Sequence, residues 1–249
     1  MRFRFSDLLL FALLFVFVAA FPVDLIPVDL TYQLLVRIGL RLLLLIYYVY
    51  IIYKYHIKIF GIANIKNLLL CLPFFIICGS NFVASSIVGG FIGQTMSALD
   101  LSLSIVYTLL IAITEEIVFR LFIHNNIQVS SSIKRIFASA GIFALMHLLN
   151  IVNVRFVGDL ITVLIQTVYT FGLGLLLGVM YEYSHSLLGC MVLHFLFNLC
   201  NDTLYTYFGG FTSELCFYLT AAVCGVVVLA YATIITLFYF QKHDQYFRR

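Results

Sequence analysis

Residues 101–122 read LSLSIVYTLLIAITEEIVFRLF, an apolar run of membrane-spanning length that carries three charged side chains near its end. An α-helix needs about 20 apolar residues to cross a hydrocarbon core of roughly 30 Å. Glu115, Glu116 and Arg120 interrupt the run, and a charged residue at the centre of a bilayer helix costs about 2.5–3.5 kcal/mol on insertion scales. The stretch therefore predicts a transmembrane helix that carries a functional site.

Similar apolar runs fill the rest of the 249-residue chain, of which 63% is hydrophobic and only 10% is charged. A soluble domain carries about 25% charged residues, so this composition predicts an integral membrane protein and excludes a nucleic-acid-binding module, a secreted disulfide scaffold and a cytoplasmic enzyme. We expect an all-α, polytopic transmembrane helical bundle that forms one domain over residues 1–249. About eight spans are predicted, at residues 8–21, 34–53, 68–88, 101–122, 136–151, 160–180, 187–199 and 215–240.

The first run has a second interpretation. It follows Arg2 and Arg4 and ends in Val18-Ala19-Ala20, which is also the pattern of a cleaved signal peptide. We favour a first spanning helix, because every later segment is also membrane-embedded and insertion does not require a cleaved signal.

Basic and acidic residues separate between the two sets of loops. Lys and Arg are retained on the cytoplasmic side of a membrane, which is the basis of topology prediction. With the N-terminus inside, the cytoplasmic segments hold Arg2, Arg4, Lys54, Lys58, Lys66, Lys134, Arg135, Lys242, Arg248 and Arg249. The opposite loops hold one basic residue, Arg155, together with Asp24, Asp29, Asp100, Asp159, Asp202 and Glu214. We therefore expect an even number of spans, with the N- and C-termini both cytoplasmic.

The charged residues inside the spans have different expected roles. Glu116 and Arg120 are spaced i,i+4, which predicts an ion pair within one helix. Glu115 points about 100° away from Glu116, has no local partner, and is a candidate proton acceptor. Arg37 and Arg41 lie one turn apart near the start of the second span, where we expect their long side chains to reach the headgroups.

Polar residues on two further spans are expected to meet Glu115. His147 lies in the fifth span, and His194 and Asn198 share one face of the seventh. Helix lengths place Glu115 and both histidines in the cytoplasmic half of the membrane, which predicts one shared, hydrated cavity. Asn150 and Gln166 would line this cavity or bridge helices. The remaining histidines are expected to be solvated in or near cytoplasmic loops: His56, His124, His185 and His243.

Two chemistries fit a glutamate, two histidines and an asparagine. In the first, Glu115 and His147 activate a water molecule, while His194 and Asn198 stabilise the oxyanion formed at an amide carbonyl. In the second, both histidines and a glutamate bind zinc, whose water is the nucleophile. The His-Glu-x-x-His motif is absent and no third histidine is well placed, so we favour the version without a cofactor or metal.

These residues resemble the CPBP family of intramembrane endopeptidases, which comprises CAAX prenyl proteases and bacteriocin-processing (Abi) enzymes. Three family motifs occur here in the family order, within a predicted catalytic core at residues 101–201. Glu-Glu-x-x-x-Arg is Glu115, Glu116 and Arg120, and Phe-x-x-x-His is Phe143 with His147. His-x-x-x-Asn is His194 with Asn198. The resemblance implies that Glu115 and His147 activate water, that His194 and Asn198 stabilise the oxyanion, and that Glu116 and Arg120 support the site. Before the third motif lie Gly172, Gly174 and Gly178, which would form a substrate groove or allow close helix packing.

The sequence thus predicts a CAAX prenyl protease 2-like intramembrane endopeptidase. It would hydrolyse a peptide or membrane-protein substrate within the lipid bilayer near the cytoplasmic face, in the cell membrane of a prokaryote, with no nucleic-acid partner. The alternatives are a non-catalytic binding protein of the same fold, such as an immunity or scaffolding factor, and a zinc-dependent protease.

Overall fold

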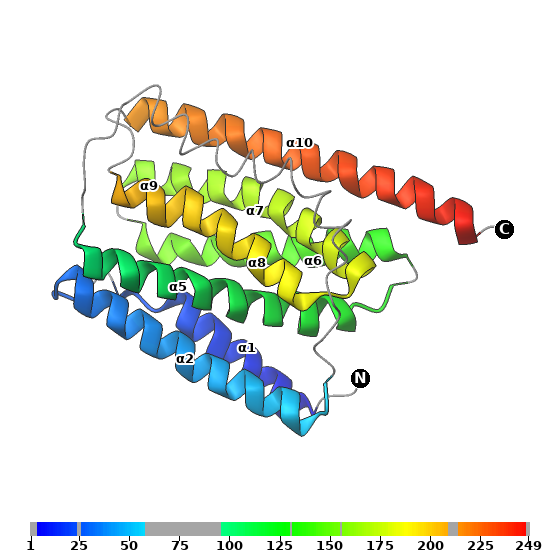
Figure 1. The fold of residues 1–249 in the computed structure, drawn as a ribbon, viewed down its shortest axis with the longest axis horizontal. Helices are drawn as coiled ribbons and strands as arrows, with labels where there is room; N and C mark the ends of the chain where they lie inside the picture. Colours follow the sequence, from blue (N-terminus) through cyan, green and yellow to red (C-terminus); the bar gives the residue numbers. More distant parts are fainter. Residues whose placement is uncertain are drawn as a thin grey trace.

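The computed structural model of the protein describes residues 4–23, 26–57, 96–129, 131–154, 156–208 and 214–247. Within these ranges every regular element is a helix, and Figure 1 shows the long helices side by side in one bundle. The α-helices are α1 (Phe5–Ala20), α2 (Leu30–Lys54), α5 (Ala98–Glu116), α6 (Ser132–His147), α7 (Val157–Ser184), α8 (Leu187–Asn198), α9 (Leu204–Tyr207) and α10 (Glu214–Phe247). The prediction of an all-α bundle is confirmed.

Six helical segments of the described chain are long and apolar enough to cross a membrane: Leu30–Lys54, Ala98–His124, Ser132–Val152, Val157–Glu182, Leu187–Tyr207 and Tyr218–Phe238. The apolar part of α1, Leu9–Ala20, is shorter. The span predicted at residues 68–88 lies outside the described residues. Large apolar side chains such as Leu43 and Ile46 face outward, as expected for a surface in contact with lipid. The chain is a polytopic integral membrane protein.

Several helices begin at a side chain that caps their first turn. Asp29 accepts a hydrogen bond from the Tyr32 N–H at 3.0 Å before α2, and Ser97 accepts one from the Asp100 N–H at 3.1 Å before α5. Ser186 caps α8 in the same way. These caps satisfy backbone donors that a helix start leaves unpaired, so the helices begin at polar residues flanking the apolar runs.

Helices α1 and α2 form an antiparallel pair, and α2 packs along α5. The start of α1 is tied to the end of α2, because Lys54 Nζ donates to Asp7 Oδ2 at 2.7 Å and the Tyr55 hydroxyl donates to the same carboxylate. The hydrogen bond from Lys54 lowers the pKa of the Asp7 carboxyl below its ordinary value. This packing brings Arg41, near the middle of α2, against the charged turn of α5.

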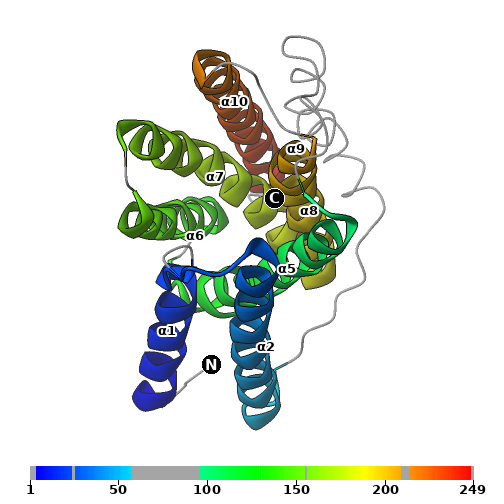
Figure 2. The same ribbon diagram turned by 90° about the vertical axis from the view of Figure 1, so that its left-hand side faces the viewer.

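Helix α7 lies between α6 and α10, as Figure 2 shows from one end of the bundle. A Cβ atom on Gly172 would lie 2.9 Å from the Leu229 Cα on α10, and one on Gly174 would lie 3.0 Å from the Ala140 Cα on α6. Real Cβ atoms essentially never lie less than 3.0 Å from such atoms, and 3.0 Å is tighter than nearly all real contacts, so glycine allows α7 to pack closely against both neighbours. These contacts support the packing interpretation of the two glycines.

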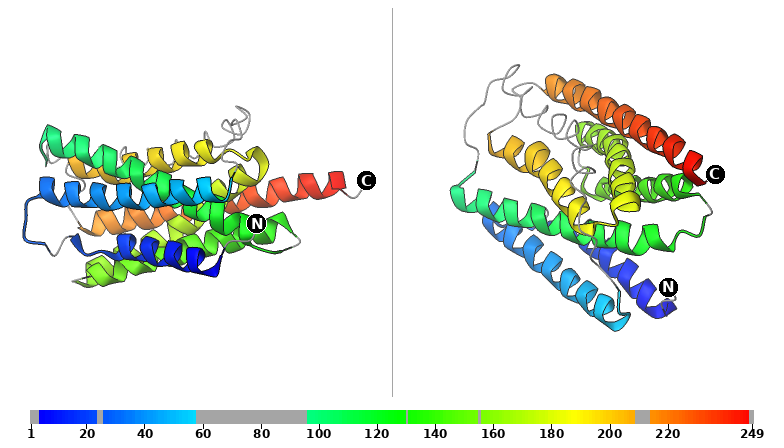
Figure 3. Two further views of the ribbon diagram at one scale, coloured as in Figure 1. Left: turned by 90° about the horizontal axis from the view of Figure 1, so that it is seen from below. Right: turned by 45° about the vertical axis from the view of Figure 1, so that its right-hand side comes forward.

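The N-terminal end of α1 and the C-terminal end of α10 lie at the same end of the bundle (Figure 3), which we call the terminal end. Lys54, Lys134 and Arg135 lie there, at the end of α2 and the start of α6. The opposite end, which we call the far end, carries acidic residues in the first turns of α5 and α7. The structure thus preserves the separation of charge seen in the sequence.

Candidate active site

Each of the three motifs lies where a helix changes its type. α5 ends at Glu116 and continues as a π-helix over Ile117–His124, and α8 ends at Asn198 and continues as a π-helix over Leu199–Thr203. α6 ends at His147 and continues as a 3₁₀-helix over Leu148–Asn153. Such departures from α-helical geometry are common at functional sites, because they redirect side chains without ending the segment.

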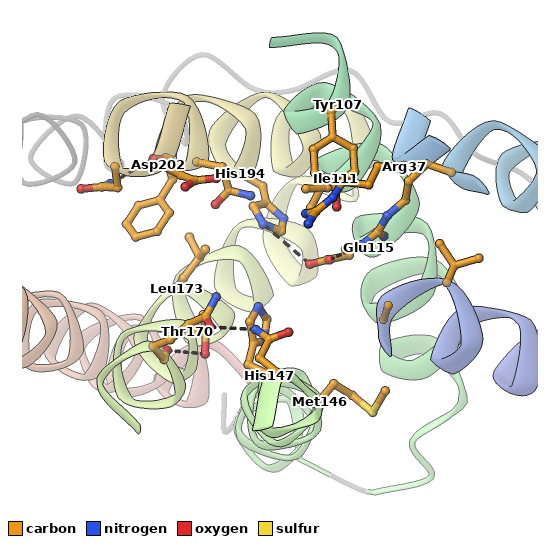
Figure 4. Close-up of a pocket in the computed structure, with 18 of the residues that line it drawn as sticks. Arg37, Tyr107, Ile111, Glu115, Met146, His147, Thr170, Leu173, His194 and Asp202 are labelled. Carbon is orange, nitrogen blue, oxygen red and sulfur yellow. Dashed lines mark hydrogen bonds and ion pairs between the residues drawn. The ribbon is translucent and has the colours of Figure 1, made fainter. Parts of the chain in front are cut away.

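The four side chains predicted to be catalytic line one cavity of about 520 Å³. Glu115 reaches it from α5, His147 from α6, and His194 and Asn198 from α8. Figure 4 shows Glu115 and His194 facing each other, with His147 on another wall of the same cavity. The predicted shared cavity is therefore present. Asn150 and Gln166 line it as well, and they also bridge α7 and the 3₁₀-helix through a 2.8 Å hydrogen bond.

Glu116 is fully buried and holds two partners in fixed directions. Its Oε2 accepts from Arg120 Nε at 2.8 Å, which confirms the predicted i,i+4 pair. Its Oε1 lies 2.9 Å from Nδ1 of His194, a contact that the sequence could not predict because the two residues are 78 positions apart. Glu116 thus links α5 to α8 beneath the cavity.

Arg120 and Phe143 complete the support of this carboxylate. Arg120 Nη1 donates to the Ser139 hydroxyl at 3.3 Å, and its guanidinium carbon lies 5.5 Å from the centre of the Phe143 ring. Phe143 is fully buried and also packs edge-on against the rings of His147 and His194, with centroids 4.8 and 5.7 Å away. Both motif residues therefore hold catalytic candidates in place from outside the cavity.

Glu115 has a partner on another helix. Arg41 Nη2 lies 3.5 Å from Glu115 Oε1, and Arg41 Nη1 donates to the Thr114 hydroxyl at 2.9 Å. Arg41 is only 5% exposed, so the expectation that its side chain reaches the headgroups is wrong. The reason is that Glu115 and Thr114 offer a buried acid and an acceptor at the same depth, which compensate the guanidinium for the loss of water. Glu115 Oε2 lies 3.9 Å from His194 Nε2.

The hydrogen-bond partners decide which nitrogen of each histidine carries a proton. His147 Nδ1 lies 2.9 Å from the Phe143 carbonyl oxygen, which can only accept, so Nδ1 is the donor and a neutral His147 leaves Nε2 as an acceptor. His194 Nδ1 likewise donates to the Glu116 carboxylate. His194 Nε2 can then act as a donor only in the imidazolium form.

The cavity extends from this polar centre to the far end of the bundle. Among the residues described, its lining stops at Arg41 along α2, at Phe119 along α5 and at Leu173 along α7, and none lies closer to the terminal end. His147 is the last residue of the 16-residue α6, late in the span Ser132–Val152. The span that carries His147 thus begins earlier than the predicted run at residues 136–151.

Other charged residues occupy positions that the sequence did not predict. Asp202, expected in a loop, lies in the π-helix that continues α8 and lines the cavity. Arg37 also lines it, with its guanidinium carbon 5.7 Å from the centre of the Tyr107 ring. His124, expected to be solvated, is 1% exposed because its Nε2 lies 2.6 Å from Glu182 Oε2. Glu182 was not singled out, since its partners lie on segments far away in the chain.

The side chains of the cavity that could bind a metal also contact other protein groups. A structural or catalytic zinc needs three or four side chains converging on one point. Within the ranges that the structure describes, no group of three His, Cys, Asp or Glu residues could hold a metal ion. Glu116 occupies Nδ1 of His194, and Arg41 places a positive charge beside Glu115.

The fold and the cavity define a polytopic membrane protein with a polar centre buried among its helices. Residues 97–200 match the protein-family model described as Rce1-like, type II CAAX prenyl endopeptidase Rce1-like. The match covers all three motifs and agrees with the resemblance to the CAAX prenyl endopeptidases that these motifs carry. The matched region runs from the start of α5 through the three motifs to the end of α8 and leaves out α1, α2 and α10. No curated protein and no solved structure matches the chain.

Proposed function

We propose that the protein is an intramembrane endopeptidase that hydrolyses a peptide bond with a water molecule activated by Glu115 and His147. The observation that carries this proposal is the convergence of Glu115, His147, His194 and Asn198 on one cavity within the matched region. A membrane interior lacks water, so a cavity lined by these polar groups is the place where water and a peptide bond can meet.

The chemistry follows from the donors and acceptors. The water would donate its hydrogens to the Glu115 carboxylate and to His147 Nε2, and its oxygen would attack the carbonyl carbon of the substrate. His194, as an imidazolium, and the Asn198 amide would donate to the resulting oxyanion. When the tetrahedral intermediate collapses, the C–N bond breaks and the proton taken from water passes to the amine that leaves. The products are a carboxylate and an amine, and no cofactor takes part.

The substrate in this proposal is a membrane-associated protein or peptide, and a prenylated C-terminal sequence is one candidate among several. Part of the cavity wall is apolar and is formed by Phe15, Met146 and Leu173. Such a wall suits a polypeptide that approaches from the bilayer, because apolar side chains of the substrate can pack against it. The proposed location is the cell membrane of a prokaryote, which a compact chain with short loops favours.

The test compares cells that carry the wild-type protein with cells that carry Glu115→Gln, a change that removes the charge but keeps the shape. Quantitative proteomics of peptide ends should show cleavage products that disappear in the variant. Asp29→Asn is the matched control, because it makes the same chemical change at a helix cap outside the cavity, where asparagine caps as well as aspartate. Its products should equal those of the wild type.

A folded Glu115→Gln protein that keeps all wild-type cleavage products would contradict the proposal and favour a binding or scaffolding role. The metal-dependent alternative predicts loss of turnover on stringent chelation and recovery with zinc alone. We expect turnover of the purified protein to survive chelation.

A further inference from the structure

An arginine from outside the matched region reaches the candidate catalytic carboxylate. Arg41 lies on α2, 74 residues before Glu115, and its side chain is 6% exposed. Burying a guanidinium is costly unless its charge is paired and its donors are satisfied. Arg41 meets this condition on one turn of α5, because one terminal nitrogen contacts Thr114 and the other lies beside Glu115.

Thr114 anchors the guanidinium independently of Glu115. The Thr114 hydroxyl donates to the Leu110 carbonyl at 2.8 Å, so its oxygen is free to accept from Arg41 Nη1 at 2.9 Å. The second arm of the rigid fork is then held 3.5 Å from Glu115 Oε1. Glu115 Oε2 is left on the side of His194 and the cavity.

The two adjacent glutamates therefore each have their own arginine. Glu116 pairs with Arg120 in the same helix, and Glu115 pairs with Arg41 across the bundle. Two carboxylates close together in a poorly hydrated site repel each other, and one of them tends to take up a proton. A protonated Glu115 could not accept a proton from water, so its base function depends on a nearby positive charge.

We infer that Arg41 is a positioning residue, which keeps the Glu115 carboxylate charged and directs its Oε2 toward the cavity. The inference rests on the proposed function, since it assigns to Arg41 a role that acts through Glu115. It also assigns α2 a part in the active centre, although the family match begins only at residue 97.

Other charged and titratable groups also face Glu115, so the effect of Arg41 has to be separated from theirs. Arg37 and Tyr48 lie on α2, where the Tyr48 phenol is within electrostatic range of both Arg41 and Glu115. His147 faces Glu115 from α6, His194 faces it from α8, and Glu116 is its neighbour on α5. Arg41 differs from Arg37 in contacting both Thr114 and Glu115.

The experiment measures kcat, KM and their pH dependence for purified wild type, Arg41→Met and Arg41→Lys, with a peptide substrate found by the proteomic comparison. Arg41→Met should lower kcat about 100-fold, the order of effect seen when one charge-stabilising group is lost from an active site. KM should change less than about threefold. The acid limb of the kcat profile should also move, because the substitution removes the positive charge that lies 3.5 Å from Glu115 Oε1.

Two comparisons separate positioning from a merely structural role. Arg41→Lys keeps the positive charge but not the two-armed geometry of the guanidinium. Its kcat should be about tenfold or more above that of Arg41→Met. Arg37→Met removes the same charge one turn away and should leave the acid limb unmoved, whatever it does to KM. A folded Arg41→Met protein with wild-type kcat and an unmoved acid limb overturns the inference, as does a Lys variant no better than Met.

Failure of the inference and failure of the proposed function give different results. If Glu115→Gln keeps full turnover, the proposed function fails. If Glu115→Gln is inactive while Arg41→Met is fully active, only the inference fails. Thermal unfolding in detergent tests the pair without turnover: the loss of melting temperature in the Arg41→Met/Glu115→Gln double variant should be smaller than the sum of the two single losses. Additive losses overturn the pairing.

Discussion

Glu116 illustrates how much of the site depends on single hydrogen bonds. Its carboxylate receives Arg120 on one oxygen and His194 on the other, and it is fully buried. Because a carboxylate can only accept, it forces the Nδ1 proton onto His194 and leaves Nε2 as the atom that faces Glu115 and the cavity. We therefore propose that Glu116 sets the proton position of His194 while staying outside the reaction.

We expect Glu116→Gln to lower kcat by about 10²–10³-fold, the cost of losing one oxyanion donor. The amide oxygen can still accept from His194 Nδ1, which keeps the proton of a neutral imidazole on Nδ1 and leaves Nε2 without a hydrogen to donate to the oxyanion. The measurement is turnover of the purified variant. Because Arg120 also loses its counter-charge, Ser139→Ala serves as the control, since it removes a hydrogen bond from Arg120 and leaves His194 untouched. Wild-type turnover in Glu116→Gln would contradict this role.

Local sequence spacing predicted one ion pair of the site and missed the others. Glu116 and Arg120 are four residues apart in one helix, so geometry alone places them in contact. The Arg41 pair depends on how α2 packs against α5, and the His124 pair joins residues 58 positions apart on different segments. The spacing of apolar residues carries no information on how helices pack. The sequence therefore predicts that Arg41 reaches the headgroups and that His124 is solvated.

At the scale of the helices, the hydrophobic runs predicted the elements well and their internal geometry poorly. Seven of the eight predicted runs correspond to described helices, and the remaining run, at residues 68–88, lies outside the described part. The seventh run continues to Tyr207, because a π-helix carries the backbone past Asn201 and Asp202. The sequence predicts that the span ends at residue 199 because Asn201 and Asp202 are polar. In the structure the helix continues, because both side chains line the cavity.

Close packing of α7 predicts a difference between two glycines. A methyl group on Gly172 would lie 2.9 Å from the Leu229 Cα and 3.0 Å from the Leu229 backbone nitrogen, so α7 and α10 would have to separate. Overpacking of this kind costs about 1–3 kcal/mol. We expect Gly172→Ala to lower the melting temperature by several degrees in detergent.

Gly141, near the middle of α6, is the matched control, since a Cβ there would have nothing within 4 Å. Gly141→Ala should leave the melting temperature unchanged or raise it slightly, because alanine favours the helix by up to about 1 kcal/mol. Equal effects of the two substitutions would show that the α7–α10 contact is not tight.

At the scale of the whole molecule, the cavity and the basic residues occupy opposite ends. The lining runs from Glu115 and His194 toward the far end, where Thr206 and Asp202 lie at its border. Toward the terminal end, buried aromatic rings pack between the helices, with Phe11 stacked on Tyr48 at 4.5 Å and packed against Phe122 at 4.4 Å. If the basic end faces the cytoplasm, as the distribution of Lys and Arg predicts, then the cavity extends toward the other side of the membrane.

This orientation can be measured with single cysteines in a background where the six native cysteines are replaced by alanine. Thr206→Cys lies at the exposed far end of the cavity, and Lys134→Cys lies exposed at the start of α6. A membrane-impermeant maleimide should label Thr206→Cys in intact cells and label Lys134→Cys only after the membrane is opened. The opposite pattern would contradict the predicted topology and place the cavity on the cytoplasmic side. The labelled face would also be the face toward which the described lining of the cavity extends from Glu115.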